Sequence, residues 1–315
     1  MNDDTLIADP IAVIGGGSIG IAFAILFARA GRPVRVHDPD PARRSVVPDE
    51  VGRRLSDLLD HGLIVEPPAA ILARITTVST LNEALAGAVL VQECAPEQLA
   101  LKRGLFADLD RLAPAEAILA SASSALQPSS FADQLPGRGR CLVTHPLNPP
   151  YLIPVIEIVP APFTSEAVVT RCEQLYRAAG MSPIRVRKEV EGFVLNRLQG
   201  ALLREAYCLV RDGVATVDDI DQAVRDALGL RWSVIGPFET ADLNTRGGIA
   251  AHAVKMGPAY ERMGAERGQH DPWTAEMVAG VVKARRRLLP LDLWEDRVAW
   301  RDRRLMDLLV QRRSS

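Results

Sequence analysis

The stretch Ile11 to Asp38, IAVIGGGSIGIAFAILFARAGRPVRVHD, decides how this chain of 315 residues folds. Its first four residues are apolar and mostly β-branched, which predicts a buried strand. The next six, GGGSIG at 15–20, have the G-x-G-x-x-G spacing, and the apolar residues 21–30 predict a helix packed on a sheet. A second short apolar run, Val34–Val36, leads to the aspartate at position 38. The stretch therefore predicts a strand, a glycine-rich turn, a helix and a second strand in immediate succession.

Each glycine of the turn has its own physical role in such a unit. Gly15 permits the tight turn, Gly17 lets the backbone approach a pyrophosphate, and Gly20 lets the helix lie close to the strand. The free N–H groups of the first helical turn, at Ser18 and Ile19, would face the phosphate charge. A glycine-rich turn alone also fits an ordinary strand-to-helix connection, so a dinucleotide site needs a further signal.

Asp38 supplies that signal, because it lies about 20 residues past the glycine turn, where an acidic residue binds the ribose hydroxyls of a dinucleotide. A carboxylate at this position would repel a 2′-phosphate, which favours NAD over NADP as the cofactor. Arg43 and Arg44 follow closely in the sequence and could weaken that preference.

Composition and charge exclude several classes of protein. The net charge of -2 gives no basic field of the kind that nucleic acid requires, and no stretch reaches the roughly 18 apolar residues of a membrane span. Met1–Asp4 is acidic and has no signal-peptide pattern, and the four cysteines are widely scattered, so we expect a cytoplasmic protein. Neither the cysteines nor the five histidines have the spacing of a metal site.

Strand-like and helix-like segments alternate up to residue 189, which predicts an α/β Rossmann-type domain with a mostly parallel, doubly wound sheet. From residue 190 onward, apolar residues recur at helical spacing and no strand pattern returns. Thr216 and Asp219 have the spacing of a capping box at the start of one such helix. We therefore expect an NAD-binding domain at 1–189 and an all-helical domain at 190–315. The last helices are expected near 249–263, 273–289 and 294–310.

His145 is the best candidate for an acid–base group, because it follows the apolar strand 141–144 and should lie at the carboxyl edge of the sheet. Twelve residues on, Glu157 stands among four apolar β-branched neighbours. A buried carboxylate needs a partner, and a histidine ring would be held in one tautomer and stabilised as an imidazolium by it. Each residue also has a structural explanation, His145 as an ordinary buried histidine and Glu157 as the partner of an arginine or a backbone donor.

Two further polar positions could contact a substrate. The run Ser121–Ser124 follows the predicted strand 118–120, so its hydroxyls could hold a substrate oxygen, although helix capping is the commoner role. Asn196 lies at the start of the first long helix after residue 190, where asparagine is more often a helix-start or interface residue.

Taken together, these segments resemble the 3-hydroxyacyl-CoA dehydrogenase family, and within it the branch of lambda-crystallin and L-gulonate 3-dehydrogenase. The resemblance covers nearly the whole chain. The family motifs are Gly15–Gly20, Glu93–Glu97, Ser121–Ser124, His145–Tyr151, Ile156–Pro160 and Glu191–Leu198. The motifs similar to the branch are Gly229–Trp232, Ile235–Thr240, Leu243–Asn244, Trp300–Asp302 and Leu305–Met306.

This resemblance implies an NAD-dependent oxidation of a 3-hydroxy group and a homodimer formed by the helical domain. By matching motifs, His145 would be the general base, Glu157 its orienting carboxylate, and Ser124 and Asn196 the donors to the substrate oxygen. Further positions that match residues lining the cofactor or substrate site in the family are Glu97, Lys102 and Asn148.

The substrate class is left open among several candidates. A free hydroxy acid such as L-gulonate needs a cation for its carboxylate, and Arg231, with Arg246 as second choice, lies in the segment distinctive of the branch. A 3-hydroxyacyl-CoA such as 3-hydroxybutyryl-CoA would instead need a cationic track for its phosphates, and no clear track appears. A carnitine-like substrate is a third candidate. A fourth candidate is a non-catalytic, crystallin-like role. A purely structural chain would have no need to retain Ser124, His145, Glu157 and Asn196 together.

Overall fold

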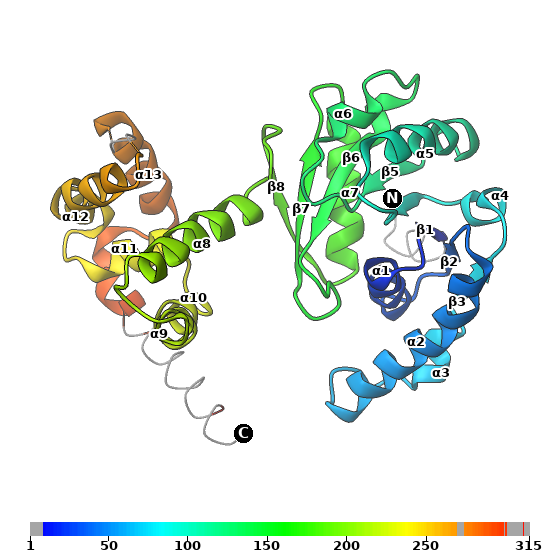
Figure 1. The fold of residues 1–315 in the computed structure, drawn as a ribbon, viewed down its shortest axis with the longest axis horizontal. Helices are drawn as coiled ribbons and strands as arrows, with labels where there is room; N and C mark the ends of the chain where they lie inside the picture. The colour runs from blue at the N-terminus through cyan, green and yellow to red at the C-terminus, as the bar shows by residue number, and fades with distance from the viewer. Residues whose placement is uncertain (1–8, 270–273, 299, 301–310, 312–315) are drawn as a thin grey trace. The chain divides into compact units, whose positions relative to one another are not determined.

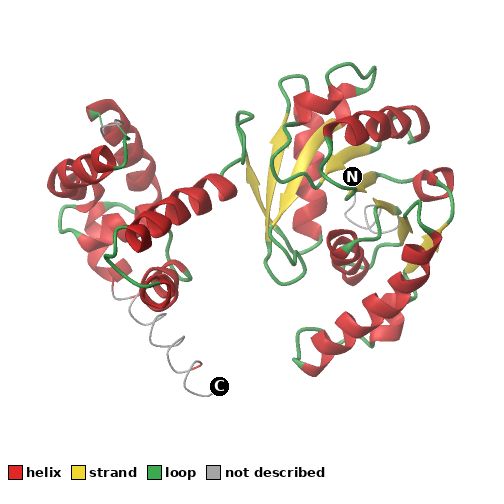
Figure 2. Ribbon diagram, in the orientation of Figure 1, coloured by secondary structure: helices red, strands yellow, loops and turns green. Residues whose placement is uncertain are grey.

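A computed structural model describes residues 9–269, 274–298, 300 and 311, apart from the side chain of residue 277. The chain consists of two compact units, one ending at Leu202 and the other beginning at Leu203. All the strands belong to the first unit, and the described part of the second is helical (Figure 2). The predicted change from alternating strands and helices to helices alone is therefore confirmed for the part of the chain that the structure describes.

The N-terminal unit is built on one eight-stranded sheet with the order β3-β2-β1-β4-β5-β6-β7-β8 (Figure 1). The order reverses at β1, because the chain first adds β2 and β3 on one side and then returns to add β4 on the other. Open sheets of this kind bind ligands beyond the carboxyl ends of the strands at the reversal. The strands are β1 (Ile11–Ile14), β2 (Val34–His37), β3 (Ile75–Val78), β4 (Leu90–Glu93), β5 (Ile118–Ser121), β6 (Cys141–Pro146), β7 (Val155–Pro160) and β8 (Ser182–Arg185).

Strands β1–β6 are parallel to one another, and β7 and β8, which are parallel to each other, run in the opposite direction. Strand β7 pairs with β6 in the antiparallel sense. Only the eight residues 147–154 join these strands, whereas a parallel crossover needs about a dozen or more. The reversal has a direct consequence for the candidate site, because the ladder sets His145 opposite Glu157.

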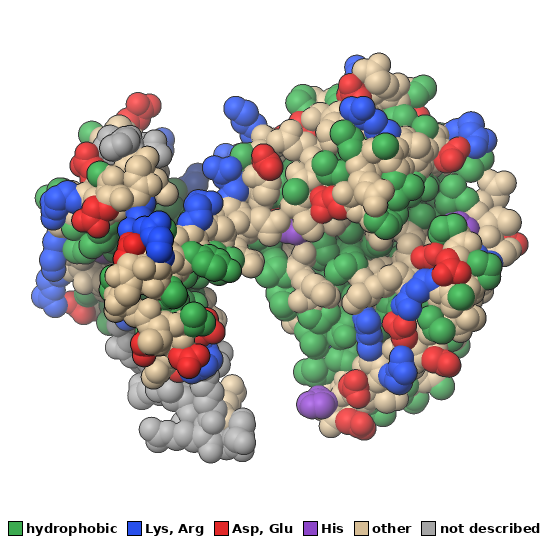
Figure 3. Space-filling model, viewed as in Figure 1, with side chains coloured by type: hydrophobic (Ala, Val, Ile, Leu, Met, Phe, Trp, Pro, Cys, Tyr) green, Lys and Arg blue, Asp and Glu red, His purple; other side chains and the backbone are tan. Residues whose placement is uncertain are grey.

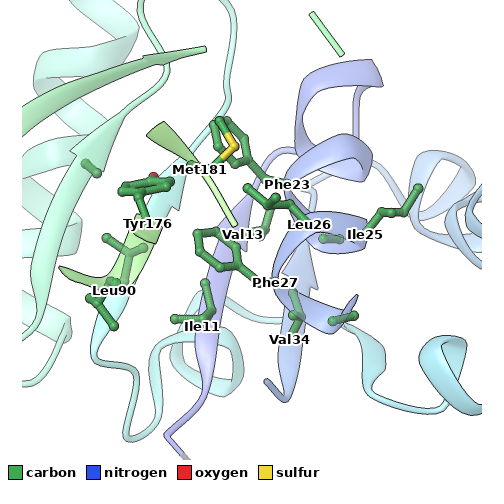
Figure 4. Packing of buried hydrophobic residues seen from close by; sticks show 14 of the residues in the cluster. Ile11, Val13, Phe23, Ile25, Leu26, Phe27, Val34, Leu90, Tyr176 and Met181 are labelled. Atoms are coloured by element: carbon green, nitrogen blue, oxygen red, sulfur yellow. The ribbon is translucent and has the colours of Figure 1, made fainter. Parts of the chain in front are cut away.

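Helices cover both faces of the sheet. Phe23 and Phe27, one turn apart on α1, pack against Tyr176 of α7, with ring centroids 6.3 and 5.6 Å from the tyrosine ring (Figure 4). This packing fixes α1 on the sheet and with it the glycine turn at its start. The helices that pack in this first apolar cluster are α1 (Ser18–Arg29), α2 (Pro41–Asp60), α3 (Pro68–Leu72) and α7 (Glu166–Ala178), and those in a second cluster are α4 (Leu81–Leu85), α5 (Leu99–Leu112) and α6 (Pro128–Ala132). A short 3₁₀ turn, η2 (Arg138–Arg140), precedes β6.

In the C-terminal unit, a buried aspartate ties three helices together. Asp242 of α11 is 0% exposed, accepts a 2.8 Å bond from the Ile249 amide of α12, and pairs with Arg286 of α13. The helices here are α8 (Leu195–Arg211), which spans the boundary between the units, α9 (Val217–Ala223), the π-helical η3 (Val224–Leu228), α10 (Gly229–Trp232), α11 (Pro237–Asn244), α12 (Gly248–Glu266), α13 (Ala275–Leu288) and the 3₁₀ turn η4 (Leu291–Leu293).

The predicted capping box is confirmed at the start of α9. The Asp219 amide donates to Thr216 Oγ1 at 3.2 Å, and the Thr216 amide donates to Asp219 Oδ2 at 3.1 Å. Of the helix expected at 294–310, residues 294–298 and 300 are described, and all of them are helical. Two residues of one branch motif, Arg301 and Asp302, and the whole motif Leu305–Met306 lie outside the described residues.

Charged side chains of both signs are interspersed on the visible face of the N-terminal unit (Figure 3). Among the described helices, none is both long enough and apolar enough to cross a membrane.

Candidate active site

The glycine turn between β1 and α1 is closely packed on its protein side and open on the other. Gly15 has a φ of +110°, which L side chains rarely adopt, and a Cβ on Gly20 would lie 1.8 Å from the Gly15 carbonyl oxygen. A Cβ on Gly17 would meet nothing within 4 Å, and this residue starts α1 without a side-chain cap. The backbone amides of this helix start, from Ser18 and Ile19 onward, are therefore accessible to a phosphate, as a dinucleotide site requires.

Asp38 is connected to this turn. Its Oδ2 accepts a 2.8 Å hydrogen bond from the Gly16 amide, and its Oδ1 accepts one of 3.0 Å from the Asp40 amide. The two arginines that could attract a 2′-phosphate already have protein partners. Arg43 binds Glu50 through two bonds of 2.6 and 2.9 Å, and Arg44 donates to the Asp38 carbonyl oxygen at 2.6 Å. Both arginines thus have protein partners, and the carboxylate of Asp38 is held beside the glycine turn by backbone amides.

His145 and Glu157 meet in the buried part of the sheet. His145 is 5% exposed and Glu157 is 0% exposed, and Nδ1 of the ring lies 2.7 Å from Oε2 of the carboxylate. The sequence argument that a carboxylate in an apolar strand needs a partner, and that His145 is available, thus agrees with the geometry. Because Nδ1 faces Glu157, the other ring nitrogen, Nε2, is the one that can meet a substrate.

The second oxygen of Glu157 reaches the start of α8. Glu157 Oε1 accepts hydrogen bonds from the amides of Val194 and Leu195, at 2.7 and 3.1 Å. The carboxylate is therefore fixed by the histidine on one side and by two backbone donors on the other, so its orientation is fully determined.

Phe193, which sequence reasoning did not single out as a site residue, lies beside His145 and directly precedes the two amides that bind Glu157. Its ring is fully buried, and the ring centroid is 5.5 Å from that of His145. Its φ of +50° is the only positive value at a non-glycine residue in the described part of the chain, and such a backbone costs about 1–2 kcal/mol. No sequence signal marks this conformation, because it results from the fold around it.

The loop after β5, which carries Ser124, is bound from two sides. Oε1 of Glu97 accepts hydrogen bonds from the Ser123 hydroxyl and from the amides of Ala125 (2.7 Å) and Leu126 (3.0 Å). From the other side, Asn196 Nδ2 donates to the Ser124 carbonyl oxygen at 2.8 Å. The structure thus brings Ser124 and Asn196 together, and Ser124 is an exposed residue.

The hydrogen bonds of Glu97 affect its titration. Burial by itself would raise its pKa, but the bonds from Ser123 and from the amides of Leu126 and Ala125, together with the charge of Lys102, lower the pKa below its ordinary value of 4.5. The nearby thiol of Cys94 behaves in the opposite way, because removal of the sulfur from water and the charge of Glu93 raise its pKa well above the ordinary value of 9.0. The raised pKa favours the protonated thiol of Cys94, which is a poor nucleophile.

Lys102 is buried beneath these loops. It is 1% exposed, and its Nζ donates to both oxygens of Glu93, at 2.9 and 2.8 Å, and to Ser121 Oγ at 3.2 Å. Ser121 in turn donates to Glu93 Oε2 at 2.5 Å. The charge of Lys102 is thus directed at protein groups that anchor the ends of β4 and β5. Sequence reasoning noted Glu93 only as part of the motif Glu93–Glu97 and did not predict its pairing with Lys102, although Glu93 ends an apolar strand.

The candidate substrate residues lie in different places. Asn148 is exposed in the connection between β6 and β7. Arg231 of α10 lies in the C-terminal unit, where it lines a pocket of about 600 Å³ with Trp232 and Tyr260. Arg246, the second choice, is ion-paired with Glu295 at 2.8 Å.

Within the described residues, no group of three or more His, Cys, Asp or Glu side chains could hold a metal ion. The site consists instead of a dinucleotide cradle on one strand–helix turn and a histidine–carboxylate pair in the same sheet.

The fold and the cradle define an NAD-binding oxidoreductase. The chain belongs to the 3-hydroxyacyl-CoA dehydrogenase family, since residues 10–190 match the NAD binding domain of 3-hydroxyacyl-CoA dehydrogenase and residues 192–286 match its C-terminal domain.

Relatives that bear different names have similar sequence identity to this chain. A lambda-crystallin homolog of Bos taurus is 41% identical over 307 residues, which cover 95% of this chain and 94% of that protein. A 3-hydroxyacyl-CoA dehydrogenase of Gibberella moniliformis is 35% identical over 309 residues, with coverage of 95% and 94%. An L-carnitine dehydrogenase of Pseudomonas putida is 38% identical over 264 residues, with coverage of 84% and 78%. The family and the similarity to lambda-crystallins, both inferred from the motifs, are confirmed.

Proposed function

We propose that this protein oxidises the 3-hydroxy group of a small free hydroxy acid, with His145 as the general base. The observation that carries the proposal is the 2.7 Å contact between His145 Nδ1 and Glu157 Oε2 in a chain with an NAD-binding domain. A ring that donates its Nδ1 proton to Glu157 keeps a lone pair on Nε2, which is what a base for an alcohol needs.

The side chains divide the work as follows. His145 takes the hydroxyl proton as the C3–H bond breaks, and Glu157 stabilises the positive charge that then resides on the ring. Ser124 and Asn196 orient the substrate oxygen, while Glu97 and Lys102 fix the loops that border the cofactor. Bound NAD would accept the hydride that leaves C3.

Arg231 supports a free acid as the substrate. Its guanidinium has no ion pair among the residues that the structure describes, whereas that of Arg246 is engaged by Glu295. An arginine that lines a pocket and has no ion pair among the described residues can bind a carboxylate with two parallel hydrogen bonds, as L-gulonate or L-carnitine would require. Asn148 would add a hydrogen bond to a further hydroxyl of a polyhydroxy acid such as L-gulonate.

A thioester substrate is the second candidate, because one of the close relatives is named 3-hydroxyacyl-CoA dehydrogenase. A non-catalytic role is the third, because others are named lambda-crystallin. The retained contacts of His145, Glu157, Ser124 and Asn196 favour catalysis over this last alternative.

Initial rates of NADH formation with L-gulonate, L-carnitine and 3-hydroxybutyryl-CoA separate these candidates. We expect turnover with a free acid, and Arg231→Gln should raise its KM about 10- to 100-fold, since a charged hydrogen bond contributes about 1.5–3 kcal/mol. Arg246→Gln is the matched control and should leave the KM unchanged. A clear preference for the thioester would overturn the substrate assignment, and no NADH with any compound would favour the crystallin-like role.

A homodimer in a reducing compartment such as the cytoplasm is part of the same proposal. Helix α8 buries none of its residues and exposes Leu198, Leu203 and Tyr207 at 60%, 45% and 75%. Apolar side chains at this exposure are typical of a surface that a second subunit covers. Multi-angle light scattering at micromolar concentration should give a mass of two chains, and the mass of one chain would contradict the dimer.

A further inference from the structure

The chain makes an unusual turn just before α8. Gly192 and Phe193 both have a positive φ, of +74° and +50°. Two successive left-handed residues redirect the backbone so that the next two amides point the same way. Those amides, of Val194 and Leu195, are the ones that donate to Glu157 Oε1. The turn therefore determines where the carboxylate of Glu157 is held.

The side chain of Phe193 contacts the other member of the pair. Its ring is completely buried in the apolar cluster of the second sheet face, and it is tilted by 57° against the imidazole of His145 at a centroid distance of 5.5 Å. The ring of Phe193 therefore lies against His145, and the amides of the next two residues bind the carboxylate of Glu157.

The choice of residue at position 193 conflicts with its local conformation. Glycine adopts a positive φ without steric cost, and a phenylalanine does not. A strained backbone of this kind persists only where the surrounding structure imposes it, and such residues cluster at functional sites. The ring, which glycine lacks, is what lies against His145.

We propose that Phe193 is a positioning residue for the His145–Glu157 pair. Its ring restricts the imidazole to the orientation in which Nδ1 faces Glu157, and its left-handed backbone presents two amides that hold the carboxylate. The inference rests on the proposed function, because it assigns to Phe193 a part in the same proton transfer.

The ring is tested by Phe193→Leu, with Phe106→Leu as the matched control. Phe106 is also fully buried in the same apolar cluster, where it packs on Phe131. Both variants should lose similar stability. Only Phe193→Leu should slow NADH formation in a single turnover, by about 10- to 100-fold, because a displaced base is a poor one. The primary deuterium isotope effect on kcat should rise, while the NAD Kd and the substrate KM change less than threefold.

The backbone is tested by Gly192→Ala, with Gly62→Ala as its control. Both glycines have a positive φ, of +74° and +68°, and at neither would a Cβ come within 3.4 Å of another group. The conformational penalty is thus the same, but only Gly192 precedes the amides on Glu157. We expect a single-turnover rate at least fivefold lower for Gly192→Ala and unchanged for Gly62→Ala.

The outcomes are distinguishable. If the unmodified protein forms no NADH with any 3-hydroxy acid, the proposed function fails. If it is active and both Phe193→Leu and Gly192→Ala match their controls, the inference alone is overturned. If Phe193→Leu does not fold, the pair of glycine variants decides.

Discussion

Two glutamates, Glu93 and Glu157, are completely buried in the same sheet, and they differ in the side chain with which each is paired. Glu93, at the end of β4, meets the ammonium group of Lys102. Glu157, in β7, meets the imidazole of His145. Both accept backbone amides as well, Glu93 from Ala95 and Glu157 from the start of α8.

The difference separates a pair whose charges already cancel from the pair that the proposed function uses in catalysis. The lysine brings its own positive charge, so the pair with Glu93 is neutral as it stands, and Ser121 satisfies the remaining hydrogen-bonding capacity. The pair of Glu157 with a neutral imidazole carries one negative charge, which disappears when the ring takes up a proton. The first arrangement holds two strand ends together, and the second is the one to which the proposed function assigns the proton transfer.

The largest expected effect comes from making the same substitution at both carboxylates. Glu157→Gln should lower the rate of hydride transfer by about 10³- to 10⁴-fold, because an amide in place of a carboxylate no longer fixes the tautomer or compensates the imidazolium. Glu93→Gln should change that rate by less than tenfold in the folded protein. Single-turnover NADH formation measures both, and equal losses in the two variants would remove the distinction.

Stability should respond in the opposite way. Lys102→Met leaves Glu93 buried without its cation and should lower the free energy of unfolding by about 3–5 kcal/mol. The double variant Glu93→Gln with Lys102→Met should recover part of this loss, since no unpaired charge remains. Urea denaturation gives the three values, and a double variant no more stable than Lys102→Met would contradict the interpretation of a coupled pair.

The smallest effect concerns Glu97, whose pKa lies below its ordinary value of 4.5 in the folded protein. A lowered pKa means that the fold favours the ionised form, so its contribution to stability is present above about pH 4.5 and is lost as the pH falls through the folded value. Glu97→Gln should therefore lower the free energy of unfolding at pH 7 and reduce its decline as the pH falls below about 4.5. Identical pH dependence in both proteins would show that the loop bonds of Glu97 contribute nothing.

Features of the fold and the site could be predicted from the sequence where a rule about burial or residue spacing applied. The glycine turn followed from its spacing, and the partnership of His145 with Glu157 followed from the cost of a lone buried carboxylate. The same reasoning applied to Glu93 would have predicted a cation beside it. The antiparallel direction of β7 was also accessible, because eight residues are too few for a crossover.

Other features were beyond sequence reasoning. The left-handed backbone of Phe193 is imposed by tertiary contacts and contradicts local preference, so no pattern in the chain announces it. The two amides on Glu157 are backbone groups, which every residue possesses. Such features become visible only when the strands and the start of α8 are in place.

The central claim is that His145 removes the hydroxyl proton, and His145→Ala tests it most directly. Rapid mixing of this variant and NAD with a substrate of the unmodified protein follows NADH formation in a single turnover, beside the NAD Kd from fluorescence titration. The account predicts a rate lower by about 10²- to 10⁴-fold with an unchanged Kd for NAD. A rate within threefold of the unmodified protein would contradict it.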